Sequence, residues 1–143
     1  EPQPALKNIF SLPVREVNSQ DGTTICDVGD QALVIGAAVS PGLDRITAMV
    51  YARDIILCNE EPHSLSARNV LKGRIKRIDS FGSRSVVSVD VGTVWMVEIT
   101  RSAVTELDLK EGNDVYAIVK ASAIQSLENG DAPKAPMNAA MKS

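Results

Sequence analysis

Two short polar segments in the second half of the chain could together bind a small anion. "SARN" (66–69) precedes an apolar run, and "VKAS" (119–122) ends one. Either segment alone is also typical of an ordinary turn or strand end. Together, however, they supply hydroxyl groups, the positive charge of Lys120 and a turn whose backbone N–H groups can converge on one point. Because each hydrogen bond to a charged group is worth roughly 1.5–3 kcal/mol, several converging bonds would hold a small dianion.

Other kinds of chemistry find little support. The single histidine, His63, lies in the polar stretch "CNEEPHSL" (58–65), and the sequence contains neither a GxxxxGK(S/T) nor a GxGxxG phosphate-binding motif. The net charge of −3 and the aromatic content of 3% argue against a barrel that binds nucleic acid, which needs a basic groove and stacking side chains. Cys26 and Cys58 lack metal-ligand spacing, so we expect two reduced, buried thiols and no metal cation. These features predict a binding protein and not an enzyme.

Alternation of apolar and polar residues dominates residues 70–125 and predicts at least four strands. It is clearest in "SVVSVDVG" (85–92) and "VWMVEIT" (94–100), and Gly-containing turns separate the runs. Residues 100–112 instead have helical spacing and end at Gly112. Thr100 or Ser102 could cap the first turn of this helix, since their hydroxyl groups accept hydrogen bonds from free backbone N–H groups.

The first half of the chain resembles a degenerate copy of the second. Three blocks align in the same order: "ALKNIFSLPVREV" (5–17) with "SARNVLKGRIKRI" (66–78), "DVGDQALVI" (27–35) with "DVGTVWMVEI" (90–99), and "AMVYARDII" (48–56) with "AIVKASAIQ" (117–125). The copies share their apolar frame, but Ala5 stands in place of Ser66 and Tyr51 in place of Lys120. This asymmetry suggests that only the second copy holds a polar ligand.

The repeat predicts an all-β fold of two tandem antiparallel β-barrels, the second with one short helix. We place the first barrel at residues 1–62 and the second, which carries the candidate site, at 63–128. Residues 129–143 have no sustained period and are expected to form a disordered tail. No apolar run approaches the roughly 20 residues that a membrane-spanning helix needs.

The second copy resembles the molybdate-binding Mop (molbindin) domain of the TOBE group. The resemblance rests on "SARNVLKGRI" and on "DVGTVWMVEITRSAVTELDLKEGNDVYAIVKASAI". It implies an OB-like barrel that binds molybdate or tungstate at interfaces between subunits, so we expect a homo-oligomer, most simply a dimer. It assigns the oxyanion to Ser66, Ala67, Arg68, Asn69, Lys120, Ala121 and Ser122, with a secondary contribution from Thr100 and Ser102.

The region between the copies resembles a more specific group of proteins. "VYARDIILCNEEPHSLSARNVL" (50–71) is similar to the join between two barrels in the C-terminal regulatory region of ATP-binding subunits of molybdate ABC transporters. This implies a cytoplasmic fragment that senses molybdate, is peripheral to the inner membrane, and works with an ATP-binding cassette domain and a membrane permease. The absence of an initial Met is consistent with a fragment. The alternative is a free-standing molbindin-type protein that stores or buffers molybdate.

Overall fold

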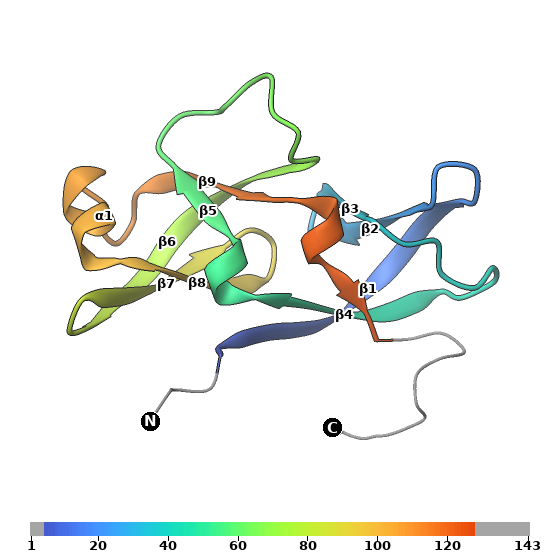
Figure 1. The fold of residues 1–143 in the computed structure, drawn as a ribbon, viewed down its shortest axis with the longest axis horizontal. Coiled ribbons are helices and arrows are strands. Elements are labelled where there is room, and N and C mark those ends of the chain that lie inside the picture. The colour runs from blue at the N-terminus through green and yellow to red at the C-terminus, as the bar shows by residue number, and fades with distance from the viewer. Residues whose placement is uncertain (1–4, 128–143) are drawn as a thin grey trace.

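Antiparallel strands make up most of the structure, a computed structural model that describes residues 5–127 (Figure 1). The elements in chain order are β1 (Lys7–Asn18), β2 (Thr23–Val28), β3 (Gln31–Ile35), β4 (Arg45–Tyr51), a 3-10 turn (Ala52–Asp54), β5 (Ile56–Cys58), β6 (Asn69–Phe81), β7 (Arg84–Asp90), β8 (Val94–Thr100), α1 (Arg101–Glu106), β9 (Asp114–Val119), a second 3-10 turn (Ala121–Ala123) and β10 (Gln125–Ser126). The prediction of an all-β fold with one short helix is confirmed. The expected tail at 129–143 lies outside the described residues.

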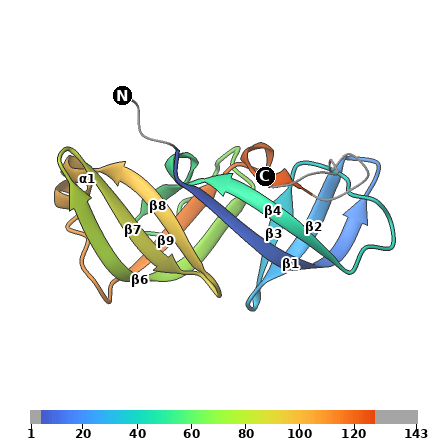
Figure 2. The ribbon, with the colours of Figure 1, turned by 90° about the horizontal axis from the view of Figure 1, so that it is seen from below.

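The strands form two five-stranded sheets that exchange their last strands. The orders are β10-β4-β1-β2-β3 and β5-β9-β6-β7-β8. Figure 2 shows β1–β4 and β6–β9 as two groups side by side. The first copy sends β5 to pair with β9, and the second copy sends β10 to pair with β4. Each sheet is therefore completed by a short strand from the other copy. At these two strands the sheets do not follow the division of the sequence at residue 62.

One continuous hydrophobic core joins the two barrels. Strand residues alternate between buried and more exposed positions, as in β2 and in the first part of β6. The inward side chains are mainly Val, Ile and Leu, and those of both sheets belong to the same buried cluster. Phe10 of the first barrel stacks on the fully buried Trp95 of the second, with ring centroids 5.5 Å apart. Because the apolar contact crosses between barrels, the two fold as one packed unit.

Two glycines from matching turns touch at the junction of the barrels. Gly29 lies between β2 and β3, and Gly92 lies between β7 and β8. Their φ angles are +61° and +114°, a region that side-chain-bearing residues rarely adopt. A Cβ on Gly29 would lie 2.9 Å from the Cα of Gly92, and the reverse substitution is equally tight. Both turns therefore need glycine for their conformation and for their close approach.

We expect Gly29→Ala to destabilise the chain more than Gly82→Ala. The two glycines have nearly the same φ, +61° and +62°, but a Cβ on Gly82 would meet nothing within 4 Å. Both variants should lose about 1–2 kcal/mol of unfolding free energy because alanine is strained in a left-handed backbone. Gly29→Ala should lose a further ~1–3 kcal/mol because its Cβ is overpacked against Gly92. Urea denaturation measures the difference, and equal losses would contradict the close contact.

The two thiols should differ in reactivity. Both cysteines are free; Cys26 is buried, whereas Cys58 is half-buried. Burial, with a smaller contribution from the charge of Asp27, raises the pKa of the Cys26 thiol from 9.0 to about 11. Because the reactive thiolate forms only as the pH rises toward the pKa, we expect iodoacetamide at about pH 8 to modify Cys58 well before Cys26. Mass spectrometry of the native chain checks this, and equal rates would contradict it.

Candidate anion-binding site

The pairing of β6 with β9 brings the two polar segments to one place. These strands are antiparallel, with Asn69 opposite Val119. Residues 66–68 therefore precede the ladder at the same end at which residues 120–122 leave it. Figure 1 shows this end of β6 and β9 beside β3 of the first barrel. The structure thus brings together the two segments that carry the seven main candidates, which are about 50 residues apart in sequence.

The side chains at this end present donors and positive charge to solvent. Ser66, Arg68, Lys120 and Ser122 are exposed, and Ala67 and Ala121 are partly buried. The ion pairs among residues 5–127 include neither Arg68 nor Lys120. Two cations without carboxylate partners, beside two hydroxyl groups, form an arrangement suited to an oxyanion.

Asn69 differs from the other candidates because its side chain points into the junction between barrels. It is 2% exposed. Its Oδ1 accepts a hydrogen bond from the Val34 N–H at 2.7 Å, and its Nδ2 donates to the Val34 carbonyl at 2.9 Å. The side-chain amide therefore binds the edge of β3 as a neighbouring strand would.

Asn8, the matching residue of the first copy, makes the corresponding contact from the first barrel to the second. Its Oδ1 accepts from the Met96 N–H at 2.8 Å, and its Nδ2 donates to the Met96 carbonyl at 2.9 Å. This structural role was missed from sequence. A signal was nevertheless present, since asparagine is the residue of the SARN turn that both copies share while its neighbours differ.

The closing segment is also bonded to the first barrel. Residues Ala121–Ala123 form a 3-10 turn, and the Ala121 carbonyl accepts a hydrogen bond from the Gly36 N–H at 3.0 Å. A Cβ on Gly36 would lie 3.2 Å from the backbone of Ala121 and Ser122. The first barrel therefore contacts both halves of the candidate site.

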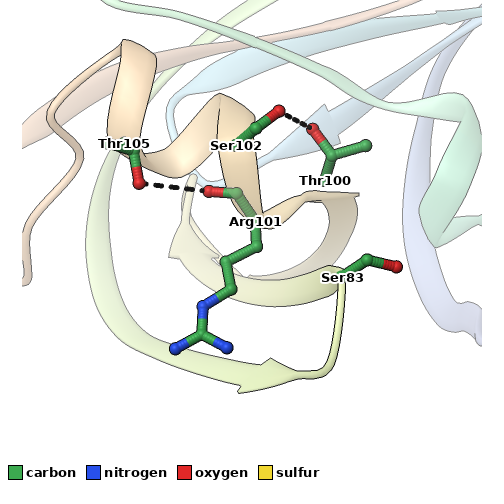
Figure 3. A pocket seen from close by; sticks show the side chains of 5 residues that line it. All are labelled: Ser83, Thr100, Arg101, Ser102 and Thr105. Carbon is green, nitrogen blue, oxygen red and sulfur yellow. Dashed lines mark hydrogen bonds between the residues drawn. The ribbon is translucent and has the colours of Figure 1, made fainter.

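Thr100 and Ser102, the secondary candidates, lie at the opposite end of the second barrel. Thr100 pairs with Arg84, which pairs with Phe81, so the 13-residue length of β6 separates this end from Asn69. An open pocket of about 500 Å³ lies there, lined by Ser83, Thr100, Arg101, Ser102 and Thr105. Figure 3 shows these five side chains. Within one chain, the structure does not bring this pocket together with the main candidates.

Thr100 caps the short helix α1, as predicted. Its Oγ1 accepts a hydrogen bond from the Ala103 N–H at 3.1 Å and lies 3.2 Å from the Ser102 Oγ. The cap satisfies one of the N–H groups that the first helical turn leaves free. Local stability therefore explains Thr100 without any ligand.

Among residues 5–127, no group of three or more His, Cys, Asp or Glu side chains is placed to hold a metal ion. His63 is exposed. In the same part of the chain, no helix has the length and apolar character to cross a membrane.

We expect Thr100→Ala to destabilise the chain by about 1 kcal/mol, the usual value of an N-cap, while Thr100→Ser retains most of it. Thermal unfolding of both variants measures this. A loss in Thr100→Ser as large as that in Thr100→Ala would contradict the capping role.

The chain is similar to several known proteins. A model of the TOBE domain matches residues 65–125. The molybdenum import ATP-binding protein ModC of Haemophilus influenzae is 29% identical over 119 residues, which are 82% of this chain and 34% of that protein. ModC of Aromatoleum aromaticum is 40% identical over 86 residues, 59% of this chain and 23% of that protein. The chain thus spans about a third or less of the length of these curated relatives.

Two further similarities extend the comparison. The molybdate/tungstate import ATP-binding protein WtpC of Pyrococcus horikoshii is 43% identical over 60 residues, 41% of this chain and 17% of that protein. A crystal structure of the cytoplasmic molybdate-binding protein ModG with molybdate bound superposes with a TM-score of 0.70 at 25% identity, covering 87% of this chain and 97% of that one. This likeness confirms the predicted OB-like fold. Residues 65–125 thus match the TOBE domain, and the chain is similar to part of the ATP-binding subunits of molybdenum and tungstate importers.

Proposed function

We propose that the chain binds molybdate or tungstate and serves as the regulatory region of the ATP-binding subunit of a molybdate importer. The observation that carries the proposal is the β6–β9 pairing, which places residues 66–69 and 120–122 at one end of the same ladder. The names of the relatives and the molybdate held by ModG support the choice of ligand.

The proposed ligands act by hydrogen bonding and charge. The hydroxyl groups of Ser66 and Ser122 and the backbone N–H groups of the Ser66–Asn69 turn donate to the oxyanion, while Arg68 and Lys120 balance its charge. In this proposal Ala67 and Ala121 contribute backbone only. Sulfate carries the same charge as molybdate and is smaller, so pocket size would have to supply the selectivity between them.

A second copy of the chain would complete the site. The candidate residues are exposed, so water competes for every donor unless another surface covers them. Thr100 and Ser102 lie too far away to help within their own chain, but the same residues of a second chain could approach. We therefore propose a homo-oligomer, most simply a dimer, with oxyanion at the interface.

Regulation would follow from linkage. An oxyanion that binds one arrangement of the paired chains more tightly stabilises that arrangement, and with it one state of the attached ATP-binding cassette domains and their permease. In this proposal the chain senses cytoplasmic molybdate at the inner face of the membrane and catalyses nothing itself.

A free-standing molybdate store or buffer is the second candidate, favoured because ModG is matched over 97% of its length. An ATP-binding cassette encoded in frame upstream of Glu1 would favour the transporter subunit over the free-standing protein.

Isothermal titration calorimetry tests the ligand assignment. We expect heat of binding with molybdate and tungstate but not with sulfate or phosphate. Calorimetry is preferable to Trp95 fluorescence because Trp95 is fully buried against Phe10 and is not one of the proposed ligands. Absence of molybdate binding at micromolar concentrations would exclude the proposal.

The double variant Ser66→Ala with Lys120→Ala removes two proposed donors from an exposed position. At roughly 1.5–3 kcal/mol each, their loss should weaken molybdate binding by at least about 100-fold without unfolding the barrel. The matched control is Lys7→Ala, which removes the same charge from the first copy, where Lys7 stands in place of Arg68. An equal effect of the control on affinity would show that general charge, and not the site, binds the anion.

A further inference from the structure

We infer that Asn69 and Gly36 are positioning residues for the oxyanion site, and that the first barrel restrains the two halves which the β6–β9 pairing brings together. The inference rests on the proposed function for its ligand, but its structural part can be tested without one. It assigns a role to the barrel that lacks the polar residues, and it gives the side chain of Asn69 a task other than ligand contact.

The outward edge of β3 carries the argument. β3 is the last strand of its sheet, so every second residue directs its backbone N–H and C=O away from β2. Val34 and Gly36 are two residues apart and face the same way, toward the second barrel. Val34 bonds to the Asn69 side chain, and Gly36 bonds to the Ala121 carbonyl.

Both halves of the site are therefore hydrogen-bonded to one short segment of the first barrel, at Val34 in β3 and at Gly36 just after its end. The opening turn is held through Asn69, whose amide lies 2.7 and 2.9 Å from the two backbone groups of Val34. The closing segment is held through Ala121, 3.0 Å from Gly36. Val34 lies in β3 and Gly36 directly follows its last residue, so the two bonds restrain the backbone of both halves relative to the same short segment. A backbone that is already restrained loses less freedom when the ligand binds.

This contact leaves little room for a side chain at position 36. A Cβ there would lie 3.2 Å from the carbonyl carbon and oxygen of Ala121 and from the nitrogen of Ser122. All three atoms are backbone, so they can yield only if the closing segment moves. The φ angle of Gly36 is not in the left-handed region, so an alanine there meets this contact without the added strain of a left-handed backbone.

The first copy provides an internal control. Asn8 bonds to Met96 on the edge of β8 as Asn69 bonds to Val34 on β3. Glu98 lies two residues beyond Met96, whereas Gly36 lies two residues beyond Val34, just after the end of β3. The asparagine contact is therefore common to both copies, whereas the glycine contact belongs to the copy with the candidate site.

The test compares Asn69→Ala, Asn8→Ala and Gly36→Ala with the unaltered chain, using molybdate as the calorimetric probe. Both asparagine variants expose a strand edge and should lower the melting temperature similarly. We expect Asn69→Ala and Gly36→Ala to weaken molybdate binding at least about tenfold, and Asn8→Ala to leave affinity within about twofold. Equal losses of affinity in the two asparagine variants would show that the effect comes from lower stability alone, and would overturn the inference. Unchanged affinity in both Asn69→Ala and Gly36→Ala would also overturn it. Should Asn69→Ala fail to fold, Gly36→Ala decides alone.

Amide hydrogen exchange supplies a readout that needs no ligand. The Gly36 N–H is protected by the Ala121 carbonyl, so it should exchange at least about tenfold faster in Asn69→Ala than in the unaltered chain, and at an unchanged rate in Asn8→Ala. Equal exchange in all three chains would overturn the positioning role. Failure of the unaltered chain to bind molybdate would instead overturn the proposed function, and the exchange rates would still decide the role of Asn69.

Discussion

The outward-facing backbone groups of two edge strands, β3 and β8, need hydrogen-bond partners, and the rest of the structure depends on how they find them. A buried donor or acceptor without a partner costs roughly 1–3 kcal/mol, and an open edge invites pairing with another chain. Here an asparagine from the opposite barrel satisfies part of each edge, Asn69 at Val34 and Asn8 at Met96. Each amide supplies both a donor and an acceptor, so it can replace a short piece of strand.

This reciprocal contact makes each barrel a part of the other. β5 and β10 cross to complete the opposite sheets, Gly29 meets Gly92, and Phe10 stacks on Trp95. The first copy therefore has a structural role in the second, and this role does not depend on ligand-binding residues. The first barrel can therefore carry Ala5 and Tyr51 where the second has Ser66 and Lys120 and still be needed for the fold.

The two copies differ in the residue that follows this contact. Both have the asparagine contact, but Gly36 stands two residues beyond Val34, where the closing segment of the second copy approaches, and Glu98 stands two residues beyond Met96. The candidate site thus has its donors on one barrel and its support on the other. Its exposed side remains available to a second chain, and the pocket beside Thr100 faces the other end of the molecule.

The sequence alone determined the strand pattern, the short helix with its Thr100 cap, the internal repeat and the difference in polar residues between its copies. All of these are local, because alternation, capping and residue identity are visible within a few neighbouring positions. From the sequence we assigned Asn69 to the ligand along with its neighbours, yet its side chain lies in the junction. The exchange of β5 and β10, the Gly29–Gly92 contact and the support of Ala121 by Gly36 were not predicted. Only the tertiary structure decided these, because each depends on which residues of two distant segments meet across an interface, and no local pattern encodes that pairing.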